Sequence, residues 1–344
     1  MARAATERTV RVDVLHDEAA GRPALYEATA RSLQAAAKEL PAIWLYDERG
    51  SHLYEEITRL PEYYLPRREA EILRARAASI ARRTQARTLV ELGAGTSENT
   101  RLLLHALESA GTLERFVPLD VSEPTLRASA QAIAAAYPRV GVRAIVGDFE
   151  RDLGALPGEG PRLIAFLGST IGNLNPESRA RFLAALAMSL ARDDAVLLGI
   201  DLVKDVATLE AAYNDSRGVT EAFVRNALTA VNRELGATFD QRRFQYEARW
   251  DPEHEWMDIG LRARESHAVA IRRLELDLAF EEHEPLRVEI SSKFRRDRFE
   301  VETGRAGLRV ESWWTDAAGD FAVALVVPEA SGSQCHPTER NGHV

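Results

Sequence analysis

Between residues 88 and 201 the chain repeats one pattern, a short apolar run followed by a longer stretch with helical apolar spacing. The apolar runs have the length of buried parallel strands, and the longer stretches have the period of amphipathic helices. Alternating strands and helices of this kind predict a doubly wound α/β sheet. The expected strands are Thr88–Leu92, Arg115–Asp120, Val142–Asp148, Leu163–Leu167 and Ala195–Ile200, and the expected helices are Ser97–Leu107, Thr125–Tyr137 and Pro176–Leu190.

The pattern changes on both sides of this region. Before it we expect a short strand at Val10–Leu15 and helices over Leu25–Leu40 and Arg67–Arg83. After residue 202, helical spacing is followed by alternating segments, which predicts a mixed α+β insertion and then a closing hairpin at the sheet edge. The expected elements are helices Val206–Ala212, Thr220–Leu235 and Phe299–Ala306, and strands Phe244–Trp250, Trp256–Arg264, Ala268–Phe280, Pro285–Phe294, Leu308–Trp314 and Phe321–Val327.

These boundaries predict a discontinuous arrangement of two domains, which suits a chain of 344 residues. Residues 67–203 and 294–330 would form the sheet domain. Residues 15–66 and 204–293 would form a second, substrate-binding domain. The polar segment 331–344 is expected to be a flexible tail.

The composition of the chain argues against several classes of protein. The net charge of −9 argues against a nucleic-acid surface. The one cysteine, Cys335, excludes a disulfide framework within the chain and suits the cytoplasm. The eight histidines show no metal-ligand spacing, and no apolar run is long enough to span a bilayer, so we expect neither a metal site nor a membrane partner.

The turn after the first parallel strand carries the clearest candidate chemistry. Gly93 and Gly95 follow the strand and allow a ligand close to the backbone. Asp120 ends the second strand, at the spacing of a residue that binds ribose hydroxyls, although it could instead cap the next helix. Asp148 ends the third strand. Because these acids meet at one rim of the sheet, we expect them to surround a nucleotide-containing cofactor.

Two cofactor classes fit such a turn. A dinucleotide needs a helix N-terminus free for its pyrophosphate, whereas here Glu98 would oppose an anion. S-adenosylmethionine (SAM) carries a positive sulfonium in place of phosphates. Charge and spacing therefore favour SAM over NAD.

Seven blocks together resemble the histidine Nα-methyltransferase family, which makes the betaine hercynine in ergothioneine biosynthesis. The similarity runs from about residue 20 to 327. The blocks are Tyr46–Ser51, Leu60–Tyr64, Glu91–Ser97, Phe166–Asn173, Asp201–Asp205, Asn232–Gly236 and Glu289–Phe294.

The resemblance implies a Rossmann-like methyltransferase sheet with an inserted substrate-binding domain, and a role for each matching residue. Gly93 would lie against SAM, Asp120 would bind its ribose, and Asp148 with Phe149 would hold the adenine. Tyr46 would sit near the reacting methyl group. The acceptor's amine and carboxylate would contact Tyr63, Asn173 and Tyr213, and its imidazole would contact Glu289 and Ser291, since a carboxylate and a hydroxyl can pair with two ring nitrogens.

This chain departs from the family pattern at two positions. Asn99 stands where a lysine often lies near the donor's carboxylate, and Ile259 stands where methionine often faces the imidazole. We expect weaker SAM binding from the first change. The second leaves another aromatic amino acid, such as tryptophan or tyrosine, as an alternative acceptor, although Glu289 favours histidine. The expected protein is thus a monomeric enzyme that methylates histidine three times by direct in-line transfer.

Overall fold

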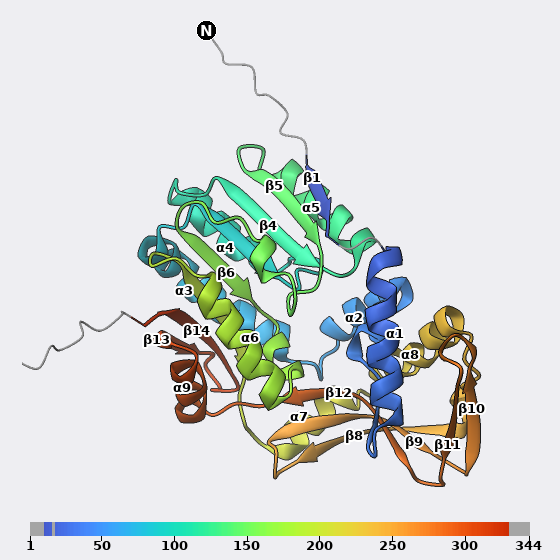
Figure 1. The fold of residues 1–344 in the computed structure, drawn as a ribbon. Coiled ribbons are helices and arrows are strands. Elements are labelled where there is room, and N and C mark those ends of the chain that lie inside the picture. Colours follow the sequence, from blue (N-terminus) through green and yellow to red (C-terminus); the bar gives the residue numbers. More distant parts are fainter. Residues whose placement is uncertain (1–9, 16–17, 330–344) are drawn as a thin grey trace, which may run out of the picture.

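The computed structural model describes residues 10–15 and 18–329. An eight-stranded sheet forms its larger part, in the order β1-β5-β4-β3-β6-β7-β14-β13 (Figure 1). Strands β3 to β7 of this sheet are parallel, and the β13–β14 hairpin continues it in the antiparallel sense, as the sequence predicts. Strand β1 adds a further parallel strand beside β5, outside the predicted bounds of the sheet domain. The strands are β1 (Arg11–Val14), β3 (Thr88–Leu92), β4 (Arg115–Asp120), β5 (Gly141–Val146), β6 (Arg162–Phe166), β7 (Ala195–Asp201), β13 (Leu308–Thr315) and β14 (Phe321–Pro328).

Helices cover both faces of this sheet, which makes it doubly wound. On one face, apolar side chains of α3 (Leu65–Thr84), α4 (Thr100–Ser109) and α5 (Glu123–Ala136) join a core cluster with Leu89 and Phe116. On the other face, α6 (Pro176–Ser189) and α9 (Arg296–Arg305) pack on a second cluster. Strand β3 has β4 on one side and β6 on the other. The winding therefore reverses at β3, and ligands of open α/β sheets bind at such a point.

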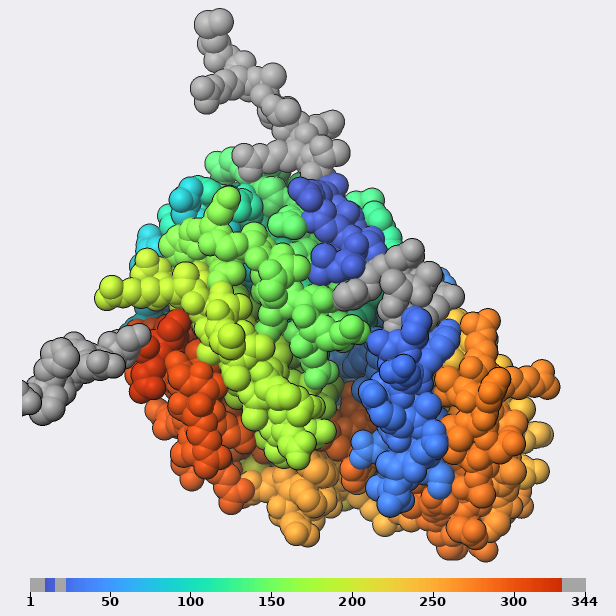
Figure 2. Space-filling model, viewed as in Figure 1, coloured from blue at the N-terminus to red at the C-terminus, as the bar shows by residue number. Residues whose placement is uncertain are grey.

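A second sheet has the order β2-β12-β9-β8 and lies at the lower right in Figure 1. Its strands are β2 (Lys38–Glu39), β8 (Phe244–Asp251), β9 (Trp256–Ala263) and β12 (Pro285–Ser292). The remaining helices are α1 (Glu18–Gln34), α2 (Glu48–Thr58), α7 (Val206–Tyr213) and α8 (Val219–Leu235). Figure 2 shows the blue surface of α1 between the yellow-green surface of α6 and the orange surface of the C-terminal half of the chain.

Three predicted elements are wrong in extent. The segment Ala268–Phe280 is a hairpin and not one strand, because Arg272–Leu274 form a 3-10 turn and Glu275 adopts a left-handed φ of 49° between β10 (His267–Ile271) and β11 (Leu276–Phe280). The helix predicted over Leu25–Leu40 begins at Glu18 and ends at Gln34, and Lys38–Glu39 pair with β12 instead. The helix predicted from Ser97 begins at Thr100.

The two sheets are joined by a short backbone bridge. Leu202, just after β7, forms a bridge with Phe294, just after β12. The carboxyl end of the parallel sheet therefore lies against the end of β12. We retain the two-domain division as a proposal, and the predicted tail 331–344 lies outside the described residues.

Candidate active site

The turn after β3 is held by backbone geometry that favours glycine. Gly93 and Gly95 have φ values of 64° and 47°, in the left-handed region. A Cβ added to Gly93 would approach no atom closer than the Phe149 Cε1, at 4.0 Å. The left-handed backbone, and not crowding by the protein, thus explains this glycine, and the open side of the turn is available to a ligand.

Asp120 is fixed by the same turn. Gly95 N donates to its Oδ2 at 2.9 Å, and Ser122 N donates to its Oδ1 at 2.8 Å. Burial raises the pKa of Asp120, while these backbone N–H groups lower it. Each carboxylate oxygen keeps a lone pair, so Asp120 is a pre-positioned acceptor for hydroxyl groups.

The segment after the neighbouring strand adds two more predicted cofactor residues. Asp148 lies two residues beyond β5 and accepts a hydrogen bond from Glu150 N at 2.9 Å. Phe149 packs against Phe166 and Phe182, with ring centroids 4.9 and 5.9 Å away. Since β3, β4 and β5 are consecutive neighbours, the structure gathers the glycines, Asp120, Asp148 and Phe149 at one sheet edge.

A buried glutamate from α3 lies at the reversal point and was missed from the sequence. Glu69 is 2% exposed and accepts hydrogen bonds from Gly168 N and Asn99 Nδ2, both at 2.8 Å. Burial raises its pKa to about 7, against the lowering effect of these donors. Asn99 Nδ2 also donates to Pro66 O at 3.1 Å. Both amide hydrogens of Asn99 are engaged in these hydrogen bonds. Asn99 could therefore donate to the carboxylate of SAM only if one of the two contacts breaks.

Glu91 explains why α4 begins later than its apolar pattern predicts. Its carboxylate accepts from Ser97 Oγ at 2.5 Å and from Thr100 Oγ1. Ser97 has a φ of 55°, which keeps the loop going past the predicted helix start. Burial raises the pKa of Glu91 to about 8, and the two hydroxyl donors lower it. Glu91 thus ties the glycine turn to the first turn of α4.

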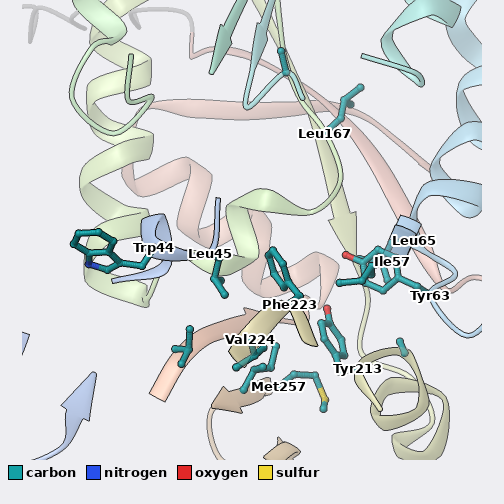
Figure 3. Packing of buried hydrophobic residues seen from close by; sticks show 14 of the residues in the cluster. Trp44, Leu45, Ile57, Tyr63, Leu65, Leu167, Tyr213, Phe223, Val224 and Met257 are labelled. Carbon is teal, nitrogen blue, oxygen red and sulfur yellow. The ribbon is translucent and has the colours of Figure 1, made fainter. Parts of the chain in front are cut away.

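Buried Tyr63 and Tyr213 (Figure 3) and partly buried Tyr46 belong to the predicted acceptor side. The rings of Tyr63 and Tyr213 meet edge to face at 6.0 Å, and Tyr46 packs in the same manner on Tyr54 and Phe223 at 6.0 and 5.6 Å. Burial raises the pKa of Tyr46, Tyr63 and Tyr213 well above 10. Their hydroxyl groups therefore stay protonated at neutral pH.

The loop after β6 brings Asn173 to Glu289 on β12. Asn173 Nδ2 donates to Glu289 Oε1 at 2.9 Å. The loop comes this close because Gly172 has no side chain, and a Cβ there would lie 2.8 Å from Ser292 O. Buried Ile259 faces Glu289 as its pairing partner on β9. Burial raises the pKa of Glu289 to about 7, and the nearby Lys293 lowers it.

Ser291 belongs to a buried charge network whose other members were not predicted as site residues. Tyr213 Oη donates to Ser291 Oγ at 2.8 Å, and Lys293 Nζ lies 2.8 Å from the same Oγ. Asp201 pairs with Lys293 at 2.7 Å, with Lys204 at 2.5 Å and with the Tyr64 hydroxyl at 2.9 Å. One signal in the sequence pointed to Lys293, because Glu289, Ser291 and Lys293 alternate along the chain and share one face of the extended segment.

Two further features bear on the chemistry. Within residues 10–15 and 18–329, no cluster of three or more histidine, cysteine, aspartate or glutamate side chains is arranged to hold a metal ion. No helix in those same ranges is long and apolar enough to cross a membrane. The side chains gathered at this site are carboxylates, hydroxyls, amides, lysine ammonium groups and aromatic rings.

The family model and the sequence relatives that match this chain agree with each other. The family model described as "Histidine-specific methyltransferase, SAM-dependent" matches residues 25–328. A histidine N-alpha-methyltransferase of Mycolicibacterium smegmatis is 50% identical over 295 residues, covering 86% of this chain and 92% of that protein. An ergothioneine biosynthesis protein 1 of Neurospora crassa is 31% identical over 81% of this chain, which corresponds to 32% of its own length. A solved structure of an S-adenosylmethionine-dependent methyltransferase from Clostridium acetobutylicum is similar with a TM-score of 0.44 and 11% identity, over 82% of this chain and 98% of that one.

Proposed function

The chain belongs to the family of SAM-dependent, histidine-specific methyltransferases, and we propose that it methylates the α-amino nitrogen of L-histidine three times to give hercynine. The choice of histidine as the methyl acceptor rests on one observation. Glu289 and Ser291, two residues apart on one face of β12, present an acceptor and a hydroxyl that match the two nitrogens of an imidazole. Neither tryptophan nor tyrosine, the alternative acceptors, has a side chain with two ring nitrogens.

The donor site would be the rim formed by β3, β4 and β5. Asp120 would accept the ribose hydroxyls, because its carboxylate is already fixed by Gly95 and Ser122. Asp148 and Phe149 would hold the adenine, Gly93 and Gly95 would allow close contact with the backbone, and Asn99 would lie near the amino-acid end. The carboxylates suit a cation, so the residues present fit SAM. When bound, SAM supplies an electrophilic methyl group on its sulfonium.

The acceptor site would hold histidine with its amine toward that methyl group. Tyr63, Asn173 and Tyr213 would bind the amine and carboxylate, and Ile259 would form an apolar wall beside the ring. Tyr46 would accept a hydrogen bond from the amine as a neutral hydroxyl. Burial raises the pKa of Tyr46, so it would orient the amine lone pair as a neutral hydroxyl.

The aromatic walls also fit the change in charge during the reaction. Each transfer leaves the amine more substituted, and the third leaves a permanent cation. Tyr46, Tyr63 and Tyr213 present rings that attract a cation without requiring an N–H group on it. The pocket can therefore keep the mono- and dimethylated amines in position for the next transfer.

The relatives place this reaction in a biosynthetic setting, and we propose the same for this chain. A relative is named as an ergothioneine biosynthesis protein, and hercynine would be the product passed to that pathway. We further propose that the enzyme works as a monomer in the cytoplasm. Light scattering of the purified protein checks the monomer, since a mass near 38.2 kDa is expected.

The direct test is incubation with SAM and L-histidine followed by mass analysis. We expect products with one, two and three added methyl groups, ending at the trimethylated betaine. An Asp120→Ala variant should give little product, while an Asp258→Asn variant, altered on β9 where Asp258 pairs with Arg287, should behave as the unaltered chain. A folded protein that binds S-adenosylhomocysteine but methylates no histidine contradicts the proposal.

A further inference from the structure

Lys293 follows β12 and is fully buried, with each of its ammonium hydrogens directed to an oxygen. Its Nζ lies 2.8 Å from Ser291 Oγ, 2.9 Å from Tyr213 Oη and 2.7 Å from Asp201 Oδ2. An ammonium group has three hydrogens and no lone pair, so these contacts use it completely. Lys293 can only donate, so the Ser291 and Tyr213 hydroxyl oxygens both act as acceptors toward it.

The hydrogen bonds around Ser291 then leave one direction for its own hydrogen. Its Oγ accepts from Lys293 Nζ and from Tyr213 Oη, which occupies both lone pairs of a hydroxyl. Neither Lys293 nor Tyr213 accepts the Ser291 hydroxyl hydrogen in this arrangement, so that hydrogen is available to a ligand. Ser291 is therefore a donor toward the acceptor pocket, and a ligand atom there must accept.

The charges around Asp201 indicate that Lys293 has a second role besides pairing with Asp201. Lys204 already neutralises Asp201 at 2.5 Å, and Tyr64 donates to both of its oxygens. A second buried lysine leaves one excess positive charge, which an ionised Glu289, two positions before Ser291, would balance. Glu289 Oε1 also accepts a hydrogen bond from Asn173 Nδ2 at 2.9 Å, and an ionised carboxylate is a good acceptor for such a bond. The charged or titratable groups around this point are Asp201, Lys204, Tyr64, Tyr213, Glu289 and Asp320.

We propose that Lys293 is a positioning residue that makes the pocket select the neutral imidazole of histidine. Ser291 donates to the unprotonated ring nitrogen, and Glu289 accepts from the ring N–H. An imidazolium carries hydrogens on both nitrogens, so one of them would face the Ser291 hydrogen. This inference rests on the proposed function, because it assumes that the imidazole lies between Glu289 and Ser291.

Ring analogues test the selection with the unaltered protein. In the presence of S-adenosylhomocysteine, calorimetry compares histidine with β-(1,2,4-triazol-3-yl)alanine, whose ring stays neutral at lower pH. Groups of the protein and the α-amine affect both ligands alike, so the affinity ratio isolates ring protonation. We expect histidine to lose about tenfold relative to the triazole per pH unit below the imidazole pKa of about 6.5. A flat ratio from pH 5 to 8, or no binding of the triazole at pH 7, overturns the proposal.

Two lysine variants separate positioning from stability. Lys293→Met should weaken histidine binding about tenfold or more and change binding of β-(2-thienyl)alanine, which has no ring nitrogen, less than twofold. Lys204→Met is the matched control, since Lys204 pairs with the same Asp201 but does not contact Ser291, and it should leave both affinities within twofold. Equal weakening of both ligands by Lys293→Met shows a structural role and overturns the proposal.

A double variant tests the route of the effect. If Lys293 acts through Ser291, then Lys293→Met should cost less than about threefold in histidine affinity when Ser291 is already alanine. Full additivity contradicts that route. These measurements report binding, so they remain distinct from the proposed function, whose failure is the absence of methylated histidine. The ring-analogue experiment also decides the matter if Lys293→Met does not fold.

Discussion

The proposed donor rim and the proposed acceptor pocket are held in different ways. At the donor rim, backbone N–H groups of Gly95 and Ser122 fix the carboxylate of Asp120. In the acceptor pocket, side chains fix other side chains, as Lys293 does for Ser291 and Tyr213. The first arrangement follows from strand pairing and turn geometry. The second depends on the balance of buried charges.

This difference predicts different sensitivity to substitution. A site built from backbone groups keeps its donors when a single side chain changes, because the sheet still places them. A buried network loses both a contact and a counter-charge when one member is removed. Variants that remove a carboxylate from each region should therefore separate an effect on one ligand from an effect on the whole fold.

Asp201→Asn should have the largest effect. Asp201 is fully buried between Lys204 and Lys293, so neutralising it leaves two buried cations without a full counter-charge. We expect the free energy of unfolding to fall by about 3–5 kcal/mol, measured by urea denaturation. Histidine affinity should also fall, because Lys293 loses its anchor.

The matched control is Asp194→Asn, at the opposite end of the same strand. Asp194 is equally buried and pairs with Arg162 at 2.5 Å, at the amino end of β7. It should lower stability by a similar amount and leave histidine affinity unchanged at a temperature where both variants are folded. Unchanged histidine affinity in Asp201→Asn would show that the network only stabilises the fold.

Asp120→Asn should affect the donor side alone. One oxygen becomes an amide that faces a backbone N–H, and the charge that would accept the ribose hydroxyls disappears. We expect S-adenosylhomocysteine to bind about 10- to 100-fold more weakly by calorimetry. Glu123→Gln, which removes the same charge from an exposed pair with Arg127, should change this affinity less than twofold. Equal losses in both variants would point to overall charge and not to a specific contact.

The contrast also explains what could be predicted from the sequence. The parallel strands, the glycine turn and Asp120 follow from local apolar runs and spacing, and the structure has the predicted strand boundaries at Thr88–Leu92 and Arg115–Asp120. The roles given to Asn173, Tyr213 and Glu289 came from a family resemblance, because no periodicity relates residues so far apart in the chain. Their contacts in the structure are tertiary.

Other residues were missed for the same physical reason. Glu69 lies in a charged helix where one buried acid looks like its exposed neighbours, and its contacts with Gly168 and Asn99 appear only when α3 packs on the sheet. Lys293 and Asp201 lay inside recognised blocks, but charge pairing across 92 positions leaves no local pattern. The single strand predicted for Ala268–Phe280 failed because a left-handed residue, Glu275, interrupts a continuous alternation.

Glu289→Gln should affect the acceptor side alone. The amide retains an oxygen for Asn173 but presents a donor where the ring N–H needs an acceptor. We expect the KM for histidine to rise about tenfold, with S-adenosylhomocysteine affinity within twofold of the unaltered chain. Asp258→Asn on the neighbouring strand is the control, because its carboxylate pairs with Arg287.

The pH dependence of the same variant gives a second check. Burial raises the pKa of Glu289 to about 7, so its acceptor form increases between pH 6 and 8. Histidine affinity of the unaltered chain should therefore rise over this range more steeply than that of the glutamine variant, whose remaining slope reflects the imidazole itself. Identical slopes would mean that Glu289 does not titrate while facing the ring.

Asn99→Lys should have the smallest effect of these variants, and it should strengthen ligand binding where the others weaken it. The asparagine side chain is occupied by Glu69 and Pro66, whereas in the proposed donor site a lysine would add a positive charge facing the carboxylate of SAM. We expect S-adenosylhomocysteine to bind about two- to fivefold more tightly, the size of a partly exposed ion pair. The gain should vanish with decarboxylated S-adenosylhomocysteine, which lacks that carboxylate, and Asn99→Gln should show no gain with either ligand. Tighter binding of both ligands would mean that the lysine acts by pairing with Glu69, and the donor's amino-acid end would then lie elsewhere.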